Sequence, residues 1–96
     1  MGIEDILRNR REEILDIARR HGVESVRVFG SVARGEAGVD SDIDLLVQPG
    51  PHTSAWFPAG MILDLEEMLG RRVDVLTEGA LHWYIRDRIL SEAVPL

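Results

Sequence analysis

The sequence predicts an α/β (α+β) fold in which a short mixed β-sheet has its helices packed on one side. Two observations support this prediction. Stretches rich in β-branched and aromatic residues alternate along the chain with stretches whose apolar residues recur at helical spacing. The chain has 96 residues, of which 45% are hydrophobic, and this is enough to pack one small core. We therefore expect a single domain over residues 1–96.

A first helix is predicted from about Ile3 to His21. Charged residues fill most of its surface, whereas apolar residues recur along one face. Gly22 follows directly, at a position where glycine often ends a helix. The apolar face consists of Ile3, Leu7, Ile14, Ile17 and Ala18. We expect this helix to be part of the scaffold.

The first strand is predicted over Val23–Phe29, and it runs into Gly30 and Ser31. Glycine lets the backbone turn sharply and lets a ligand approach closely. Ser31 is a residue type that caps helices, and helix N-termini attract anions. The two residues are therefore either an anion-binding turn or an ordinary turn with a serine cap. One helical turn later, Arg34 is placed either to reach a phosphate or to pair with Glu36.

The second strand is predicted over Asp42–Gln48 and carries two acids, Asp42 and Asp44. Because side chains alternate across a strand, both carboxylates leave the same face, about 7 Å apart along the chain. Ile43 and Leu45 point the other way, into a core. Adjacent acids repel unless a cation joins them, and Mg²⁺ takes oxygen ligands together with substrate phosphates. A phosphate-binding turn beside a metal-binding pair indicates chemistry on a nucleotide.

The second half of the chain is predicted to contain a helix, a strand and a helix. The first of these helices begins near Pro58 and ends at about Leu69, the strand covers Arg71–Thr77, and the last helix covers about Ala80–Ala93. Asp74 lies at the centre of this strand and points away from its apolar face. Such an acid belongs either to the sheet surface or to a site. The acidic pair on the preceding strand favours a site, because a neighbouring strand would bring Asp74 to the same face.

Composition excludes several classes of function. The net charge of −6 argues against broad binding to nucleic acid or to anionic membranes. The absence of cysteine excludes disulfides and thiolate metal sites, and the absence of lysine excludes a catalytic lysine. Hydrophobic runs are short and interrupted by charges, and the N-terminus does not have the pattern of a secretory signal. We therefore expect no membrane span and a cytoplasmic location.

These motifs together resemble the signature of the DNA polymerase beta-type nucleotidyltransferase superfamily. The signature consists of Gly30-Ser31, then Asp42-x-Asp44 on the next strand, then Asp74 on a third strand. The segments 30–36 and 41–47 look like those of the minimal nucleotidyltransferases (MNT). These are single small domains, often encoded beside a helical HEPN protein. The resemblance covers nearly the whole chain and implies the nucleotidyltransferase fold.

The resemblance also implies an activity and its cofactors. Family members transfer a nucleoside monophosphate from a nucleoside triphosphate to a hydroxyl, and two Mg²⁺ ions can stabilise the entering and leaving oxygens. Asp74 would complete one metal site and assist deprotonation of the acceptor. The implied site consists of Asp42, Asp44 and Asp74 as catalytic and metal-binding residues, and of Gly30, Ser31 and Arg34 as nucleotide-binding residues.

Three functions follow from the resemblance. In the first, the chain is the antitoxin of a HEPN/MNT pair and transfers AMP from Mg-ATP to a hydroxyl of its partner toxin. In the second, it transfers a nucleotide to a small molecule, although so short a chain leaves little surface for a small acceptor. In the third, it neutralises the partner by binding alone. Candidate contacts to a partner are the apolar residues Trp56, Phe57, Trp83, Tyr84, Val94, Pro95 and Leu96.

Overall fold

The computed structural model of the chain describes residues 3–38 and 40–96. Its elements follow in the order α1 (Ile3–Asn9), α2 (Arg11–Arg20), β1 (Val23–Phe29), α3 (Gly30–Ala33), β2 (Ile43–Pro49), α4 (Ala59–Leu69), β3 (Val73–Thr77), the 3-10 turn η1 (Glu78–Ala80), α5 (Trp83–Glu92) and β4 (Val94–Pro95). None of the helices in this part of the chain is long and apolar enough to cross a membrane.

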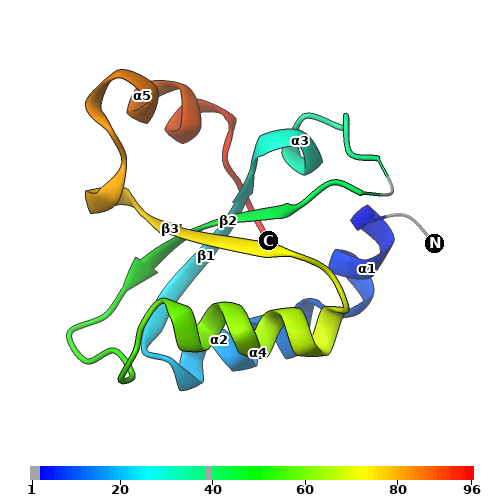
Figure 1. The fold of residues 1–96 in the computed structure, drawn as a ribbon. Helices are drawn as coiled ribbons and strands as arrows, with labels where there is room; N and C mark the ends of the chain where they lie inside the picture. The colour runs from blue at the N-terminus through cyan, green and yellow to red at the C-terminus, as the bar shows by residue number, and fades with distance from the viewer. Residues whose placement is uncertain (1–2, 39) are drawn as a thin grey trace.

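The strands form one mixed sheet in the order β3-β2-β1-β4 (Figure 1). β1 pairs with β2 and with β4 in antiparallel fashion, whereas β2 and β3 run parallel. The register of the parallel pair places Asp44 opposite Asp74. The predicted α/β fold with a short mixed sheet is therefore confirmed.

The larger core lies between the sheet and the helices α1, α2 and α4. In Figure 1, α2 and α4 lie below the sheet and α1 lies to its right. The period-two pattern of β2 and β3 determines which residues enter it, and Ile43 and Leu45 are fully buried as predicted. The helices contribute a stripe of aliphatic side chains at helical spacing. These are Ile3, Leu7, Ile14, Ile17, Ala18, Met61, Leu65 and Leu69.

A smaller core lies on the opposite face of the sheet, under α5. Leu46 of β2 and Phe29 of β1 pack there with Ile89 of α5. The prediction that all helices pack on one side was therefore wrong for α5. The reason is the composition of β2, in which Leu45, Leu46 and Val47 are consecutive buried residues, so that this strand needs an apolar cover on both faces.

The first predicted helix is divided into two. α1 ends at Asn9 and α2 begins at Arg11, because Arg10 has a φ of −107° and a ψ of 14°. The polar run 8–13 contains no buried residue, so nothing holds the middle of a single long helix against the sheet. The chain reorients at this point, and each short helix buries its own apolar residues.

The C-terminal segment also differs from the prediction. α5 begins at Trp83, three residues later than predicted, after the turn η1. Tertiary contacts hold this turn, because the carboxylate of Glu78 pairs with Arg27 of β1 while its carbonyl accepts a hydrogen bond from Arg86 of α5. After α5 the tail forms the short strand β4 beside β1, which the sequence did not predict.

Candidate active site

The turn after β1 requires glycine at its first position. Gly30 has a φ of +74°, and a Cβ added there would collide with the carboxylate of Asp44. The prediction that Ser31 caps the following helix was wrong, because Phe29 is the residue that precedes α3 and no side chain caps it. Gly30 and Ser31 are the first residues of α3, and Gly30 lies directly beside Asp44 of the acidic strand β2.

The three predicted carboxylates come together at one region of the sheet. Asp42 directly precedes β2, Asp44 lies within β2, and Asp74 lies opposite Asp44 on β3. Burial raises the pKa of Asp44 to about 6, and the negative charges of Asp74 and Asp42 contribute to this increase. The three acids therefore lie close together, as the alternation of side chains along the strands predicted. Their proximity contributes to the raised pKa of Asp44.

The donor chemistry of these acids suits a hard divalent cation. Their oxygens are the ligands that Mg²⁺ takes in proteins, and the raised pKa of Asp44 reflects crowded negative charge that such a cation would offset. Within residues 3–38 and 40–96, no three His, Asp or Glu side chains are already arranged as a complete metal-binding group. The fit therefore rests on ligand type and charge.

A cavity of about 390 Å³ opens between the turn after β1, the acidic strand and α5. This volume lies within the usual range for small-ligand sites. The cavity is lined by Phe29, Gly30, Ser31, Arg34, Asp42, Asp44, Arg88, Ile89 and Glu92. Five of the six predicted site residues thus line one cavity. The sixth, Asp74, is exposed on the adjacent strand and does not belong to the lining of this cavity.

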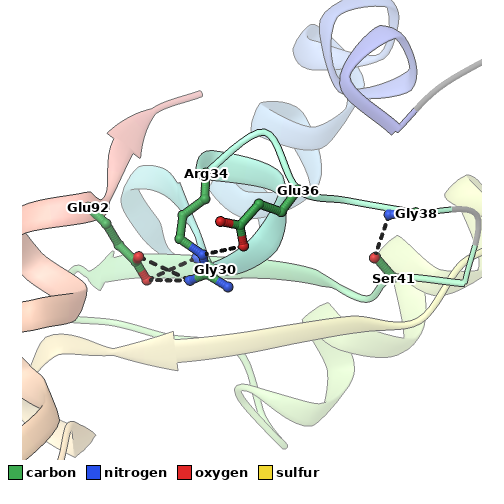
Figure 2. Close-up of polar contacts among 6 residues, drawn as sticks. All are labelled: Gly30, Arg34, Glu36, Gly38, Ser41 and Glu92. Carbon is green, nitrogen blue, oxygen red and sulfur yellow. Dashed lines mark hydrogen bonds and ion pairs between the residues drawn. The ribbon is translucent and has the colours of Figure 1, made fainter.

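Arg34 lies between two carboxylates (Figure 2). Its Nε donates to Glu36 at 3.1 Å, which is one of the two predicted alternatives, and its Nη1 donates to Glu92 of α5 at 3.1 and 3.3 Å. Glu92 also accepts a hydrogen bond from the backbone N–H of Gly30 at 3.3 Å. The predicted phosphate donors therefore already contact a carboxylate of the same chain.

Two further contacts hold Asp42 and the loop before it. In that loop the backbone N–H of Gly38 donates to Ser41 Oγ at 2.8 Å (Figure 2). Arg72, just before β3, approaches the carboxylate of Asp42 with its Nε at 3.8 Å, although its side chain is largely exposed. The hydrogen bond within the loop is the stronger of the two, because the ion pair of Arg72 is exposed to solvent.

Sequence reasoning missed the contribution of α5 to the site. Arg88 and Glu92 are four residues apart on α5, on either side of the buried Ile89, and both line the cavity. The signal was present as i,i+4 spacing beside an apolar position. Without the knowledge that α5 covers the acidic face of the sheet, this spacing is typical of any solvated helix.

Comparison with known proteins assigns the chain to a family. The sequence profile of the family described as "Nucleotidyltransferase domain" matches residues 11–96. The chain belongs to this family. It is a minimal nucleotidyltransferase, as its motifs suggested, and it covers nearly the full length of the relatives described next.

Two relatives show how close the similarity is. The chain is 44% identical over 94 residues to a Methanocaldococcus jannaschii protein assigned as a protein adenylyltransferase, and the match covers 98% of this chain and 97% of that protein. It is 38% identical over 92 residues to the protein adenylyltransferase MntA of Thermococcus cleftensis, covering 96% of this chain and 90% of the relative. The nucleotidyltransferase class of this enzyme is therefore established by homology.

Solved structures agree with this assignment. A structure assigned as a minimal nucleotidyltransferase superimposes with a TM-score of 0.85 at 49% identity, covering 100% of this chain and 97% of that one. A chain from a toxin–antitoxin complex crystallised with AMP-PNP superimposes with a TM-score of 0.74, covering 88% of this chain and 69% of that chain. At 17% identity, this second similarity supports the fold alone.

Proposed function

We propose that this nucleotidyltransferase transfers AMP from Mg-ATP to a hydroxyl on a partner HEPN-type toxin, and thereby acts as its antitoxin. One observation carries the proposal. The glycine turn, Arg34 and the acidic pair Asp42 and Asp44 line a single cavity, with the third acid on the next strand. The names of the relatives, protein adenylyltransferases, support a protein as acceptor and ATP as donor of the adenylyl group.

The reaction is a displacement at the α-phosphorus of ATP. A hydroxyl oxygen of the acceptor forms a bond to this phosphorus while the bond to the bridging oxygen of the β-phosphate breaks, so that pyrophosphate leaves with the bonding electrons. The hydroxyl proton passes to a base, and Asp74 beside Asp44 is the residue that we assign to this role. Its exposure suits an acceptor that arrives from another protein.

The remaining residues position the nucleotide. Gly30, Ser31 and Arg34 would hold the β- and γ-phosphates, and Asp42, Asp44 and Asp74 would hold two Mg²⁺ ions. When bound, Mg²⁺ neutralises phosphate charge and stabilises the entering and leaving oxygens. Most of the rate acceleration would come from this positioning and from electrostatic stabilisation.

Intact mass spectrometry of the protein encoded next to this chain tests the proposal. That protein is incubated with Mg²⁺, one NTP at a time, and either wild-type chain or the variant Asp42→Asn/Asp44→Asn. We expect a mass gain of one AMP with wild type and ATP. Because the variant loses both cation-binding acids, we expect it to transfer at least about 10²-fold more slowly.

A matched control removes the same charge elsewhere. Asp5→Asn/Asp16→Asn neutralises two exposed acids that make only surface ion pairs on α1 and α2. Such pairs contribute little to stability, so this variant should transfer AMP like wild type. If the partner gains no mass with the wild-type chain but still forms a complex with it and with both variants, neutralisation by binding becomes the better explanation than AMP transfer. Pyrophosphate release with a small hydroxyl compound alone would instead favour a small-molecule acceptor.

A further inference from the structure

Building on the function proposed above, we propose that Glu92 determines the affinity for the nucleotide, because its carboxylate occupies the place of the triphosphate. The triphosphate and the carboxylate would use the same two donors, the backbone N–H of Gly30 and the guanidinium of Arg34. Nucleotide binding therefore requires Glu92 to leave both donors.

The contacts of Glu92 resemble those of a bound anion. One oxygen, Oε1, accepts from Gly30 N at 3.3 Å and from Arg34 Nη1 at 3.3 Å, while Oε2 accepts from Arg34 Nη1 at 3.1 Å (Figure 2). Only 17% of the side chain is exposed, compared with 65% for Glu36, the other carboxylate on Arg34. Glu92 is thus the better shielded of the two acids.

The position of Glu92 in α5 makes these contacts informative. It is the last residue of the helix, where the partial negative charge of the helix end disfavours an acid. Its carboxylate nevertheless lies inside the cavity, next to Asp44, whose pKa the charge of Glu92 helps to raise. The hydrogen bonds from Gly30 N–H and Arg34 offset the repulsion of Glu92 by the helix end and by Asp44. A polyphosphate offers these partners more negative charge than a carboxylate, so it can displace Glu92.

Displacement would leave a cavity with more positive character. Arg34 keeps its second partner, Glu36, and remains at the turn. Arg88, four residues before Glu92 on α5, also lines the cavity. Within residues 3–38 and 40–96 its guanidinium has no ion pair with a carboxylate, so it can turn toward a phosphate.

The test measures nucleotide binding without a partner. Binding of AMP-PNP and of AMP, each with Mg²⁺, is measured by isothermal titration calorimetry for wild type, Glu92→Gln and Glu36→Gln. Glutamine keeps the size of Glu92 and one of its two acceptor oxygens, but it removes the charge and replaces the other oxygen by an amide donor. We expect Glu92→Gln to bind AMP-PNP about tenfold more tightly than wild type, because one charge-assisted competitor is lost. We expect its affinity for AMP to be unchanged.

Glu36→Gln is the matched control, because it removes the same charge from the same arginine without touching Gly30. We expect its affinity for AMP-PNP to change less than about twofold. Equal affinities of wild type and Glu92→Gln for AMP-PNP would overturn the role of Glu92 and leave the proposed function intact. If none of the three proteins binds AMP-PNP, both proposals fail.

A second measurement uses wild type only and does not depend on the folding of a variant. Inorganic tripolyphosphate is added to isotope-labelled protein, and the Gly30 amide and the Glu92 side-chain carboxyl carbon are followed by NMR. We expect both resonances to shift with the same midpoint, because one group is exchanged for the other. A shift at Gly30 with an unchanged Glu92 carboxyl would contradict displacement.

Discussion

Asp44 is a candidate ligand for a cation, but its ionised carboxylate lowers the stability of the metal-free protein. Burial and three acidic neighbours, Asp74, Asp42 and Glu92, raise its pKa from 3.8 to about 6. The folded state therefore binds the proton more tightly than the unfolded state, and the metal-free protein loses stability as the pH rises from about 4 to about 6. Above this range the cost of the ionised carboxylate remains. A cation bound at the site would offset this cost.

Because stability falls as Asp44 ionises, the variant Asp44→Asn should change the stability of the protein in the absence of divalent metal. The variant removes a carboxylate that is unfavourable when ionised, so it should be more stable than wild type at about pH 8. We expect a gain on the order of 1 kcal/mol, because solvent screens this partly exposed group. At about pH 4, where Asp44 is largely protonated in the folded state, most of the gain should vanish. Urea unfolding at the two pH values measures the difference.

The exposed acid Asp16 provides the comparison. It pairs with Arg19 and Arg20 on the surface of α2, and the variant Asp16→Asn should show no such stabilisation at the higher pH. If Asp44→Asn were no more stable than wild type at about pH 8, burial and the neighbouring acids would not raise the pKa of Asp44.

At the scale of elements, the short helix α3 positions the site through its first residue. Gly30 has a positive φ of +74°, and the space for a Cβ is taken by Asp44. Gly70, which ends α4, has a similar φ of +66°, but a Cβ added there would meet no atom within 4 Å. A substitution at Gly70 would therefore cause backbone strain alone, whereas a substitution at Gly30 would also cause a collision with Asp44.

We predict different outcomes for alanine at these two glycines. Gly70→Ala should cost about 1 kcal/mol of stability from the left-handed backbone and leave AMP transfer unchanged. Gly30→Ala should cost more, because the backbone strain is joined by displacement of Asp44, and it should lose most of the transfer activity. Thermal unfolding and the mass-spectrometric transfer assay measure the two effects. Similar losses of activity in both variants would argue against a special role of the Gly30 turn.

The elements also show what could be predicted from the sequence. β1 was placed at its observed bounds, and Ile43, Leu45 and Asp74 face the predicted sides, because the period-two pattern is local to each strand. The break at Arg10 and the strand β4 were missed. They depend on where distant elements pack, which a local pattern does not contain.

The residues that line the candidate site could likewise be predicted only where they belong to one local segment of the chain. Residues that belong to the strand–turn–strand segment, such as Gly30 and Asp44, follow from local spacing and from the family signature. Arg88 and Glu92 enter only because α5, which is distant from Asp44 in the sequence, folds over the acidic face. The cavity residues that the sequence did not predict are therefore those that tertiary packing brings to the cavity.

At the scale of the whole molecule, α5 connects the cavity with an exposed aromatic surface. Its inner face carries Ile89 and Glu92, whereas its first residues, Trp83 and Tyr84, are 80% and 67% exposed. Their ring centroids lie 5.8 Å apart, and those of His82 and Tyr84 lie 4.4 Å apart. We name His82, Trp83 and Tyr84 the aromatic surface. A protein that brings a hydroxyl to the cavity along α5 would meet it.

Other predicted partner contacts divide into two groups. Trp56 and Val94 are 85% and 47% exposed, Pro95 is exposed as well, and all three thus remain candidates for contact. Phe57 and Leu96 were predicted as contacts as well, but both are partly buried against the larger core. For Leu96 the reason is the strand β4 before it, which brings the last residue to β1, where its N–H donates to Val26. These two residues therefore stabilise the fold.

The aromatic surface gives the last prediction, a loss of partner binding without a loss of stability. Trp83→Ala/Tyr84→Ala removes two exposed rings, so the melting temperature should stay within a few degrees of that of wild type. If these rings anchor the HEPN-type toxin, the Kd of the complex should rise at least about tenfold, as for other buried aromatic contacts. Leu63→Ala is the control, because Leu63 is 66% exposed on α4, on the opposite side of the sheet. Calorimetric titration of the toxin into each variant should leave the Kd of Leu63→Ala unchanged. An equal Kd for both variants would mean that the toxin approaches the cavity from another side, and that α5 contributes to the nucleotide site alone.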